Sequence, residues 1–322
     1  MNPQPSSRHR KVANIQPRQY FIKANGLQFC VEERGNPQGP PLILIMGLAC
    51  QLIHWPETLL EGLAARGYRV IRFDNRDIGL SDKVTSRIQV NTRMSWLYHR
   101  LGLKPQANYS LRDMAADTAG ILQAMQVQSA HVVGVSMGGM IAQLLAAHYP
   151  EQVRSLTVMM SSTNHPRLPI PELSLMLKLN QVGPAAHDQQ TVTKRWLTFW
   201  KAVQSPDYPT PTARVRELVE ASYQRCYSPG GTLRQMQAIL ATGSLETVIR
   251  HIRCPTLVIH GDRDPLLRPA CGKAVAKRIR DAEFHLIRGM GHDLPEALLP
   301  RFINMIGQTV AEGEARLSMQ PA

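Results

Sequence analysis

Short runs of apolar residues alternate along this chain with longer segments in which apolar positions recur every three to four residues. The apolar runs cover residues 42–46, 69–73, 131–135, 155–160, 256–260 and 284–287. Because such runs leave no polar face for solvent, they predict strands of a mostly parallel sheet that is buried on both faces. The segments between them predict helices, among them 57–66 and 110–125. The second begins at Ser110, with Asp113 in the capping-box position.

Two further patterns complete the predicted architecture. Asn25-Gly26 separates two alternating segments and predicts a β-hairpin with a type I′ turn. Between residues 161 and 245 the strand pattern stops, and helical runs remain at 172–180, 191–200, 213–226 and 233–240. We therefore predict an α/β fold with a mostly parallel eight-stranded sheet flanked by helices. A helical cap is inserted between its sixth and seventh strands.

The domain boundaries follow from these patterns. The core is expected to span residues 20–160 and 246–310, and the cap residues 161–245. Residues 1–19 are predicted to form a basic, disordered tail, because five Lys or Arg and no acidic residue occur in the first 23 positions. Residues 311–322 are expected to form a flexible C-terminal tail.

The most informative motif is Gly-x-Ser-x-Gly at residues 134–138, which lies between an apolar run and a helix-forming segment. This context predicts a strand that turns sharply into a helix with Ser136 at the turn. Gly134 and Gly138 suit such a turn because a Cβ atom at either position would collide with the strand or the helix. A serine exposed in this way is a candidate nucleophile.

Two later strands end in turns that carry an acid and a base. Asp264 follows the run 256–260, and His292 follows the run 284–287. His292 is a candidate general base for Ser136, and Asp264 is a candidate to orient its ring. Asp262 is the alternative acid in the same turn, whereas Asp293 adjoins His292 and cannot easily fold back onto its ring.

The order Ser136, Asp264, His292 is that of the α/β-hydrolases. From about Tyr20 to Gln308 the chain resembles an α/β-hydrolase-fold serine hydrolase. The resemblance implies an oxyanion hole formed by two backbone N–H groups, those of Leu48 and Met137.

The loop after the first apolar run refines this resemblance. Most family members have His-Gly there, whereas this chain has Met46-Gly47. Since the donor is a backbone group, the change leaves the role intact. With Met-Gly at this position, the chain resembles a subgroup of esterases related to polyketide methylesterases, in which the same dipeptide recurs. A second sequence pattern typical of the family, Asp-x-Arg-x-x-Gly-x-Ser, lies within residues 70–83. Its four defined residues are interpreted as structural: Asp74, Arg76, Gly79 and Ser81.

In the family, the cap covers the active site and contributes substrate contacts. The candidates for such contacts are Gly47, His54, Trp55, Trp196 and Trp200. For His54, Trp55 and the tryptophans of the predicted cap, packing in the core or within the cap is the alternative interpretation. The apolar character of the cap favours an ester with an apolar acyl or alcohol group.

The charge of the chain adds one open question. The net charge is +13, and the stretch from Lys83 to Arg112 carries six basic and no acidic residues. Trp96, Leu97, Tyr98 and Leu101 interleave with these charges and predict a small amphipathic helix. It is either a solvated surface helix or a site that attracts acidic substrates, an acyl carrier protein or anionic lipid. No motif for nucleic-acid binding is present.

The remaining chemistry is limited. The five cysteines are odd in number and scattered, as expected for free thiols in a cytoplasmic protein. The N-terminal residues lack the apolar segment of a secretory signal, and no run approaches the length of a transmembrane helix. No spacing typical of metal ligands occurs, so we expect neither a metal nor a cofactor. A monomer or homodimer is expected.

We predict a serine hydrolase that cleaves a carboxylic ester through an acyl-serine intermediate. Carbon–carbon bond hydrolases, perhydrolases and acyltransferases use the same three residues and remain alternatives, as does a non-catalytic ligand receptor on the same fold. Haloalkane dehalogenases and epoxide hydrolases need a carboxylate in place of Ser136, and the charged cap helices do not suggest a lipase lid.

Overall fold

The computed structural model describes residues 16–85, 88, 91–175 and 188–319. Its centre is one eight-stranded sheet with the strand order β1-β2-β4-β3-β5-β6-β7-β8. The strands are β1 (Arg18–Ala24), β2 (Leu27–Gly35), β3 (Pro41–Ile45), β4 (Arg69–Phe73), β5 (Ala130–Val135), β6 (Val153–Met159), β7 (Thr256–Gly261) and β8 (Glu283–Ile287). β1 and β2 pair antiparallel, as do β2 and β4, and the remaining pairs are parallel. The predicted fold class is therefore confirmed.

The hairpin at the edge of the sheet forms where the sequence predicts it. β1 and β2 pair from Arg18 opposite Glu33 to Ala24 opposite Leu27. The two turn residues, Asn25 and Gly26, have φ angles of 49° and 76°. Both angles are positive, as a type I′ turn requires, and glycine and asparagine reach this region at little cost.

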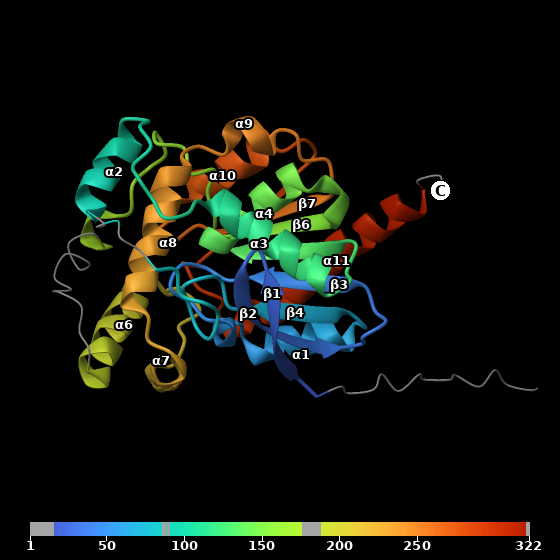
Figure 1. Cartoon of the computed structure of the whole chain (residues 1–322), viewed down its shortest axis with the longest axis horizontal. Helices are drawn as coiled ribbons and strands as arrows, with labels where there is room; N and C mark the ends of the chain where they lie inside the picture. Colours follow the sequence, from blue (N-terminus) through green and yellow to red (C-terminus); the bar gives the residue numbers. More distant parts are fainter. Residues whose placement is uncertain (1–15, 86–87, 89–90, 176–187, 320–322) are drawn as a thin grey trace, which may run out of the picture.

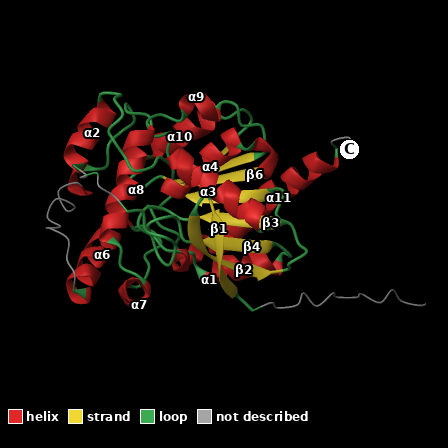
Figure 2. Ribbon diagram, viewed as in Figure 1, coloured by secondary structure: helices red, strands yellow, loops and turns green. Residues whose placement is uncertain are grey.

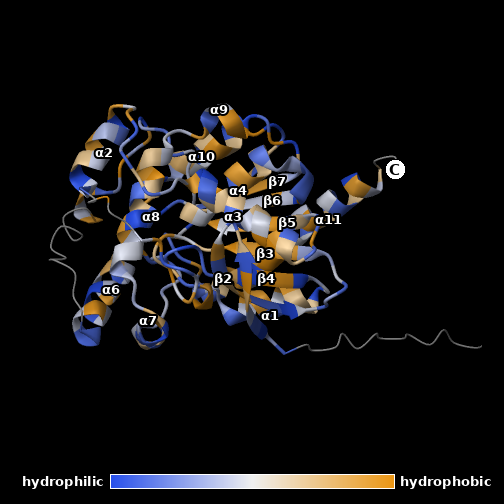
Figure 3. Ribbon diagram, viewed as in Figure 1, coloured by the Kyte–Doolittle hydropathy of each residue, from blue (hydrophilic) through white to orange (hydrophobic). Residues whose placement is uncertain are grey.

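Helices cover both faces of the sheet (Figure 2). One face packs against α3 (Leu111–Ala124), α4 (Met137–His148), α9 (Glu246–Ile249) and α10 (Pro269–Arg278), and the other against α1 (Glu57–Ala65) and α11 (Leu299–Ser318). Each face of the sheet therefore has its own hydrophobic core, and successive side chains of β3 point into them alternately. Ile43 and Ile45 belong to the core on the α3 and α4 side, and Leu42 and Leu44 to the core on the α1 and α11 side. The central strand β3, whose residues 42–45 are all apolar and buried, is accordingly coloured as hydrophobic (Figure 3).

The segment between β6 and β7 is helical, as predicted. It contains α6 (Gln189–Val203), α7 (Thr212–Arg225) and α8 (Pro229–Thr242), and no strand occurs in its described residues. We call these three helices and their connections the helical insertion. Of the helix predicted at 172–180, only residues 172–175 are described, and of these residues 173–175 are helical. The insertion lies beyond one end of the sheet, together with α2 (Thr92–Arg100), which packs on α8 (Figure 1).

The described residues also form three short 3₁₀ helices: η1 (Leu52–His54), η2 (Pro150–Gln152) and η3 (Glu296–Leu298). The helix predicted at 57–66 is α1, and the helix opened by Ser110 is α3, where the Ser110 and Asp113 side chains form the expected capping box. Among the described residues, no helix combines the length and the apolar character needed to cross a bilayer.

The predicted chain ends need correction. α11 continues to Ser318, so the flexible tail expected from residue 311 is wrong for residues 311–318. The helix continues because Gly313 packs closely on the backbone of Arg154, whose guanidinium pairs with Glu314 at 2.9 Å. At the other end, β1 begins at Arg18, inside the predicted tail, and residues 1–15 of that tail lie outside the described residues.

Candidate active site

Ser136 lies at the sharp turn between β5 and α4, with φ 54° and ψ −122°. This conformation is strained for a residue with a side chain. The two flanking glycines make it possible: a Cβ on Gly134 would lie 2.3 Å from the Gly138 carbonyl oxygen, and one on Gly138 would lie 2.0 Å from the Ile45 carbonyl oxygen. The turn holds the Ser136 hydroxyl out from the end of the sheet, as the motif predicts.

The structure brings the three predicted residues together. His292 Nε2 lies 3.0 Å from Ser136 Oγ, and His292 Nδ1 lies 2.7 Å from Asp264 Oδ2. The residues come from loops after β5, β7 and β8, which end at the same edge of the sheet. Both contacts are within the reach that proton transfer and ring orientation require.

Asp264 is buried and held mainly by hydrogen bonds. Its Oδ1 accepts from the backbone N–H groups of Leu266 and Leu267, both at 2.9 Å. His260 Nε2, which lies 2.6 Å from the Leu267 carbonyl oxygen, approaches Asp264 Oδ2 at 3.4 Å. Burial by itself would raise the pKa of Asp264, but attraction to His292 and hydrogen bonds from His260 and His292 hold that pKa well below its usual value. Asp264 is therefore a carboxylate at neutral pH.

The two other aspartates near the site face elsewhere. Asp262 Oδ1 accepts a hydrogen bond from the Gly289 backbone N–H at 2.7 Å. Asp293 Oδ1 accepts from the Ser205 backbone N–H at 3.0 Å and from the Ser205 hydroxyl. Of the three carboxylates, Asp264 is the one that contacts the His292 ring among the described residues.

The loop after β3 lies against Ser136. Gly47 packs so closely that a Cβ there would lie 3.2 Å from Ser136 Cβ. Asn75 Nδ2 donates to the Met46 carbonyl oxygen at 2.9 Å, and the Ala49 N–H donates to Gln235 Oε1 at 3.0 Å. These contacts fix the loop on both sides of Leu48.

The two predicted oxyanion donors are available in this arrangement. No acceptor in the described part of the chain takes a hydrogen bond from the backbone N–H of Leu48 or Met137. Met137 is the first residue of α4, where the N–H groups of a helix have no partner within it. The positive end of the α4 dipole adds to the attraction for negative charge at this point.

The residues interpreted as structural form a buried support below the loop. Asp74 Oδ1 accepts from the Leu52 N–H at 2.7 Å, and Oδ2 accepts from the Leu80 N–H at 2.9 Å. Gly79, with φ 56°, sits so close to Asp74 that no Cβ would fit. The remaining contacts are those of Ser81 Oγ, which donates to the Asp74 carbonyl oxygen at 2.6 Å, and of Arg76, which pairs with Asp117 at 2.6 Å.

The helical insertion is joined to this support by residues that sequence reasoning missed. Arg225 of α7 donates to Asp74 Oδ2 and to Gln51 Oε1, both at 2.7 Å. Gln51 Nε2 in turn donates to the backbone of the insertion at Ser222 and Cys226. Gln235 of α8 bonds the loop at Ala49, as described above. No sequence motif marks these residues, because their partners are far away in the chain.

A second junction joins the insertion to the loop that carries His292. The His292 N–H donates to the Val203 carbonyl oxygen at 2.7 Å, and the Gly291 N–H donates to Ser205 Oγ at 2.8 Å. Asp293 completes the junction through its bonds to Ser205, but its Oδ2 has no partner among the described residues. Burial, only partly offset by the Ser205 hydrogen bonds, raises the pKa of Asp293 to about 6.

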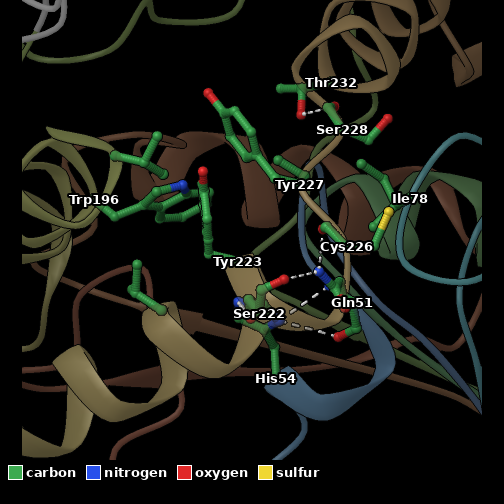
Figure 4. A pocket seen from close by; sticks show the side chains of 13 residues that line it. Gln51, His54, Ile78, Trp196, Ser222, Tyr223, Cys226, Tyr227, Ser228 and Thr232 are labelled. Carbon is green, nitrogen blue, oxygen red and sulfur yellow. Dashed lines mark hydrogen bonds between the residues drawn. The ribbon is translucent and has the colours of Figure 1, made fainter. Parts of the chain in front are cut away.

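A narrow pocket lies between the insertion and the loop after β3 (Figure 4). We call it the aromatic pocket, and its lining includes Trp196, Tyr223 and Tyr227 from the insertion and Ala49, Gln51 and His54 from the loop. Its volume is about 50 Å³. The Tyr223 and Tyr227 rings stack at 5.2 Å, and the His54 ring lies 6.4 Å from that of Trp196. Burial and the nearby Arg225 lower the pKa of His54 to about 4, despite its hydrogen bond with Gln51, so its ring is neutral at physiological pH.

The predicted substrate contacts divide between pocket and core. His54 and Trp196 line the aromatic pocket, whereas Gly47 packs on Ser136 outside it. The contact predicted at Trp55 is contradicted, because its side chain is 1% exposed and belongs to the core on the α1 side of the sheet. Trp200 does not line this pocket. The sequence alone cannot tell which of these tryptophans lines a pocket and which packs in the core, because that depends on the neighbouring elements.

Cysteines and possible metal ligands were predicted to play no part in the site. All five cysteines are free, as predicted. In the parts of the chain that are described, no group of three or more His, Cys, Asp or Glu side chains is arranged to hold a metal ion.

Comparison with known proteins agrees with this architecture. The family model for the alpha/beta hydrolase fold matches residues 40–296. The rhodomycin D methylesterase of Streptomyces sp. (strain C5) is 30% identical over 286 residues, which cover 82% of this chain and 88% of the methylesterase. The 2-hydroxymuconate semialdehyde hydrolase of Pseudomonas sp. (strain CF600) is 27% identical over 305 residues, covering 91% and 94% of the two chains. The crystal structure of the enol-lactonase from Burkholderia xenovorans LB400 superposes with a TM-score of 0.70 at 18% identity, covering 91% of this chain and all of that one.

Proposed function

Because the chain belongs to the alpha/beta hydrolase fold family, we propose that it is a serine hydrolase that cleaves a carboxylic ester through an acyl-serine intermediate. The observation that carries the proposal is the continuous set of contacts from Asp264 through His292 to Ser136, at 2.7 and 3.0 Å. The likeness to a methylesterase at 30% identity supports an ester as the substrate and a small alcohol as the leaving group.

The first half of the reaction forms the acyl-enzyme. His292 Nε2 takes the proton from Ser136 Oγ as the oxygen attacks the ester carbonyl carbon. The carbonyl oxygen becomes an oxyanion that accepts hydrogen bonds from the Leu48 and Met137 N–H groups. The carbon–oxygen bond to the alcohol then breaks, and His292 gives its proton to the departing alkoxide. Asp264 stabilises the imidazolium that exists between these two transfers.

The second half regenerates the enzyme. A water molecule loses a proton to His292 as it attacks the acyl carbon, and the same two N–H groups hold the new oxyanion. The bond to Ser136 Oγ breaks, Oγ recovers the proton from His292, and the carboxylic acid leaves. No electron acceptor or metal is needed for either half, since the reaction only exchanges an alcohol for water.

The aromatic pocket is the proposed site for one substituent of the ester. Its lining includes Ala49, which directly follows the proposed donor Leu48 in the sequence. The Trp196, Tyr223 and Tyr227 rings and the hydroxyl-bearing residues Ser222, Ser228 and Thr232 also line it. An aromatic or other flat apolar group with a polar edge would match such walls. Because its volume is about 50 Å³, a group larger than one or two waters requires movement of the insertion or of its side chains.

The test is turnover of methyl and p-nitrophenyl esters by the wild type and by Ser136→Ala, beside labelling with a fluorophosphonate probe. We expect the substitution to lower kcat by at least about 10⁴-fold and to abolish labelling, because the nucleophile is lost. Thermal unfolding should be nearly unchanged, since alanine occupies the same backbone conformation. Retained turnover in the variant would contradict the proposal.

Carbon–carbon bond hydrolysis is the second candidate, because a 2-hydroxymuconate semialdehyde hydrolase aligns over 91% of this chain. Such a substrate would also need Ser136 and His292 but releases a carbon leaving group. Labelling of Ser136 by the probe without turnover of any ester in the series would favour this reaction over ester cleavage.

A further inference from the structure

Helix α2 presents the opposite of the usual surface pattern. Its buried residues are the polar Ser95 and His99, which lie one turn apart. Both bond to α8: Gln237 Nε2 donates to Ser95 Oγ at 2.7 Å, and His99 Nδ1 lies 3.2 Å from the Leu240 carbonyl oxygen. An ordinary surface helix turns its apolar stripe inward and its polar side chains outward. Here the polar stripe faces the protein.

The large apolar side chains of this segment are exposed instead. Their exposed fractions lie between 40% and 65%, and the residues are Met94, Trp96, Leu97, Tyr98, Leu101 and Leu103. We call them, with the basic residues described next, the α2 surface. Single exposed apolar residues are common on proteins, but a contiguous group indicates a binding surface. The hydrogen bonds of Ser95 and His99 keep the helix in this orientation, so rotation to bury the apolar side would break both.

The charged residues of α2 and its flanking segments are all basic. Arg93 and Lys104 are exposed, and neither pairs with a carboxylate in the described part of the chain. Arg100 lies 6.0 Å from the Trp96 ring centre and donates to the Leu168 carbonyl oxygen at 2.9 Å. From Lys83 to Arg112 the sequence has no acidic residue. A partner that fits this surface must be apolar in its interior and negatively charged at its boundary.

We propose that the α2 surface docks the protein on anionic phospholipid bilayers. Leucine side chains enter the acyl boundary, tryptophan and tyrosine favour the headgroup layer, and lysine and arginine contact lipid phosphates. The surface lies on α2, at the end of the molecule away from the C-terminus of α11 (Figure 1). An anionic bilayer matches both features of the surface, because its acyl boundary receives apolar side chains and its headgroup phosphates supply the negative charge.

The experiment is co-sedimentation of the full chain with vesicles of phosphatidylcholine alone and of phosphatidylcholine mixed with phosphatidylserine. We expect binding to the mixed vesicles that weakens as salt is raised, and little binding to the neutral ones. The double variants Leu97→Ser/Leu101→Ser and Arg93→Gln/Lys104→Gln should each lower the partition coefficient at least about tenfold. All four positions are exposed, so thermal unfolding should be unchanged.

A charge-matched control separates this surface from the general positive charge of the chain. Lys23→Gln/Lys277→Gln removes the same charge from exposed positions on β1 and α10, and it should leave vesicle binding within about twofold. Equal loss in the control and the α2 variants, or no binding to mixed vesicles by the wild type, would overturn the proposal. The proposal would also be overturned if the chain bound an acidic carrier protein through Leu97 and Leu101 but did not bind vesicles, because the surface would then be a protein interface. None of these readouts depends on ester turnover.

Discussion

The sheet-bearing core and the helical insertion hold their functional groups in different ways. In the core, the backbone positions the functional side chains: a strained turn presents Ser136, and two backbone N–H groups fix Asp264. In the insertion, side chains from separate helices form the aromatic pocket, and long-range polar contacts such as that of Arg225 with Asp74 join it to the core. The comparison indicates that the reacting groups are fixed by the ends of strands, whereas the pocket depends on how the insertion is seated. Changes in the core should therefore act on the rate of the chemistry, and changes in the insertion on stability and substrate affinity.

The largest effect among the remaining changes is expected for Asp264→Asn. The substitution removes the charge that stabilises the imidazolium and favours the wrong tautomer of His292, so kcat should fall by about 10⁴-fold. The matched control is Asp262→Asn, two residues away, whose carboxylate bonds to the Gly289 N–H and not to His292. Its kcat should stay within about threefold of the wild type. A larger loss in Asp262→Asn than in Asp264→Asn would show that the acid has been assigned to the wrong residue.

The junction at Asp293 predicts a dependence of stability on pH. The pKa of Asp293 is raised to about 6 in the folded protein, against about 4 in an unfolded chain. Between these values the folded state holds a proton that the unfolded state has released, so the free energy of unfolding falls as pH rises through this window. The loss should approach, at most, about 3 kcal/mol and level off above the folded-state pKa.

Asp293→Asn tests this dependence. Asparagine keeps an acceptor for the Ser205 N–H but cannot ionise, so urea unfolding at several pH values across the window should show a flatter profile than the wild type. Glu312→Gln, at an exposed position of α11, is the control and should keep the wild-type profile. An unchanged slope in Asp293→Asn would mean that another group titrates in this range.

The smallest effect is expected in the aromatic pocket. Trp196→Ala removes one of its walls and should raise KM for an aromatic ester by about tenfold with little change in kcat, since a lost apolar contact of this size is worth about 1–2 kcal/mol. Trp200→Ala is the matched variant in the same helix, because Trp200 does not line the pocket. Its KM should be close to that of the wild type, and thermal unfolding of both variants would reveal any loss of packing. A larger change in KM for Trp200→Ala would place the substrate elsewhere.

The aspartates near His292 illustrate the limit of sequence reasoning. Chain order and position after a strand predicted Asp264 as the partner of His292 with Asp262 as the alternative, and the structure has Asp264 at 2.7 Å from the ring. Asp293 was correctly excluded as the partner of that ring, but its contact with Ser205 could not be foreseen. The two residues are far apart in the sequence, and their meeting depends on how the helical insertion returns to the core.

Helices α2 and α3 show the same limit for surfaces. Both begin at a capping residue, Asn91 or Ser110, and both have apolar positions at helical spacing. α3 buries its apolar side against the sheet, while α2 buries Ser95 and His99 and exposes its large apolar residues. Periodicity indicates that a helix has two faces, but the neighbouring helix decides which face is inside.

The sequence by itself determined the strands, the tight turns, the nucleophile and base candidates Ser136 and His292, and the turn that carries the acid. Each of these depends on local chemistry: unbroken apolar runs, glycines where a Cβ cannot fit, and the order of acid and base along the chain. Tertiary structure alone decided that Trp55 belongs to the core and Trp196 to a pocket, that Arg225 and Ser205 join the insertion to the core, and that residues 311–318 continue a helix. These outcomes depend on which surfaces meet across long stretches of chain, because burial and hydrogen bonding are properties of the neighbours in space.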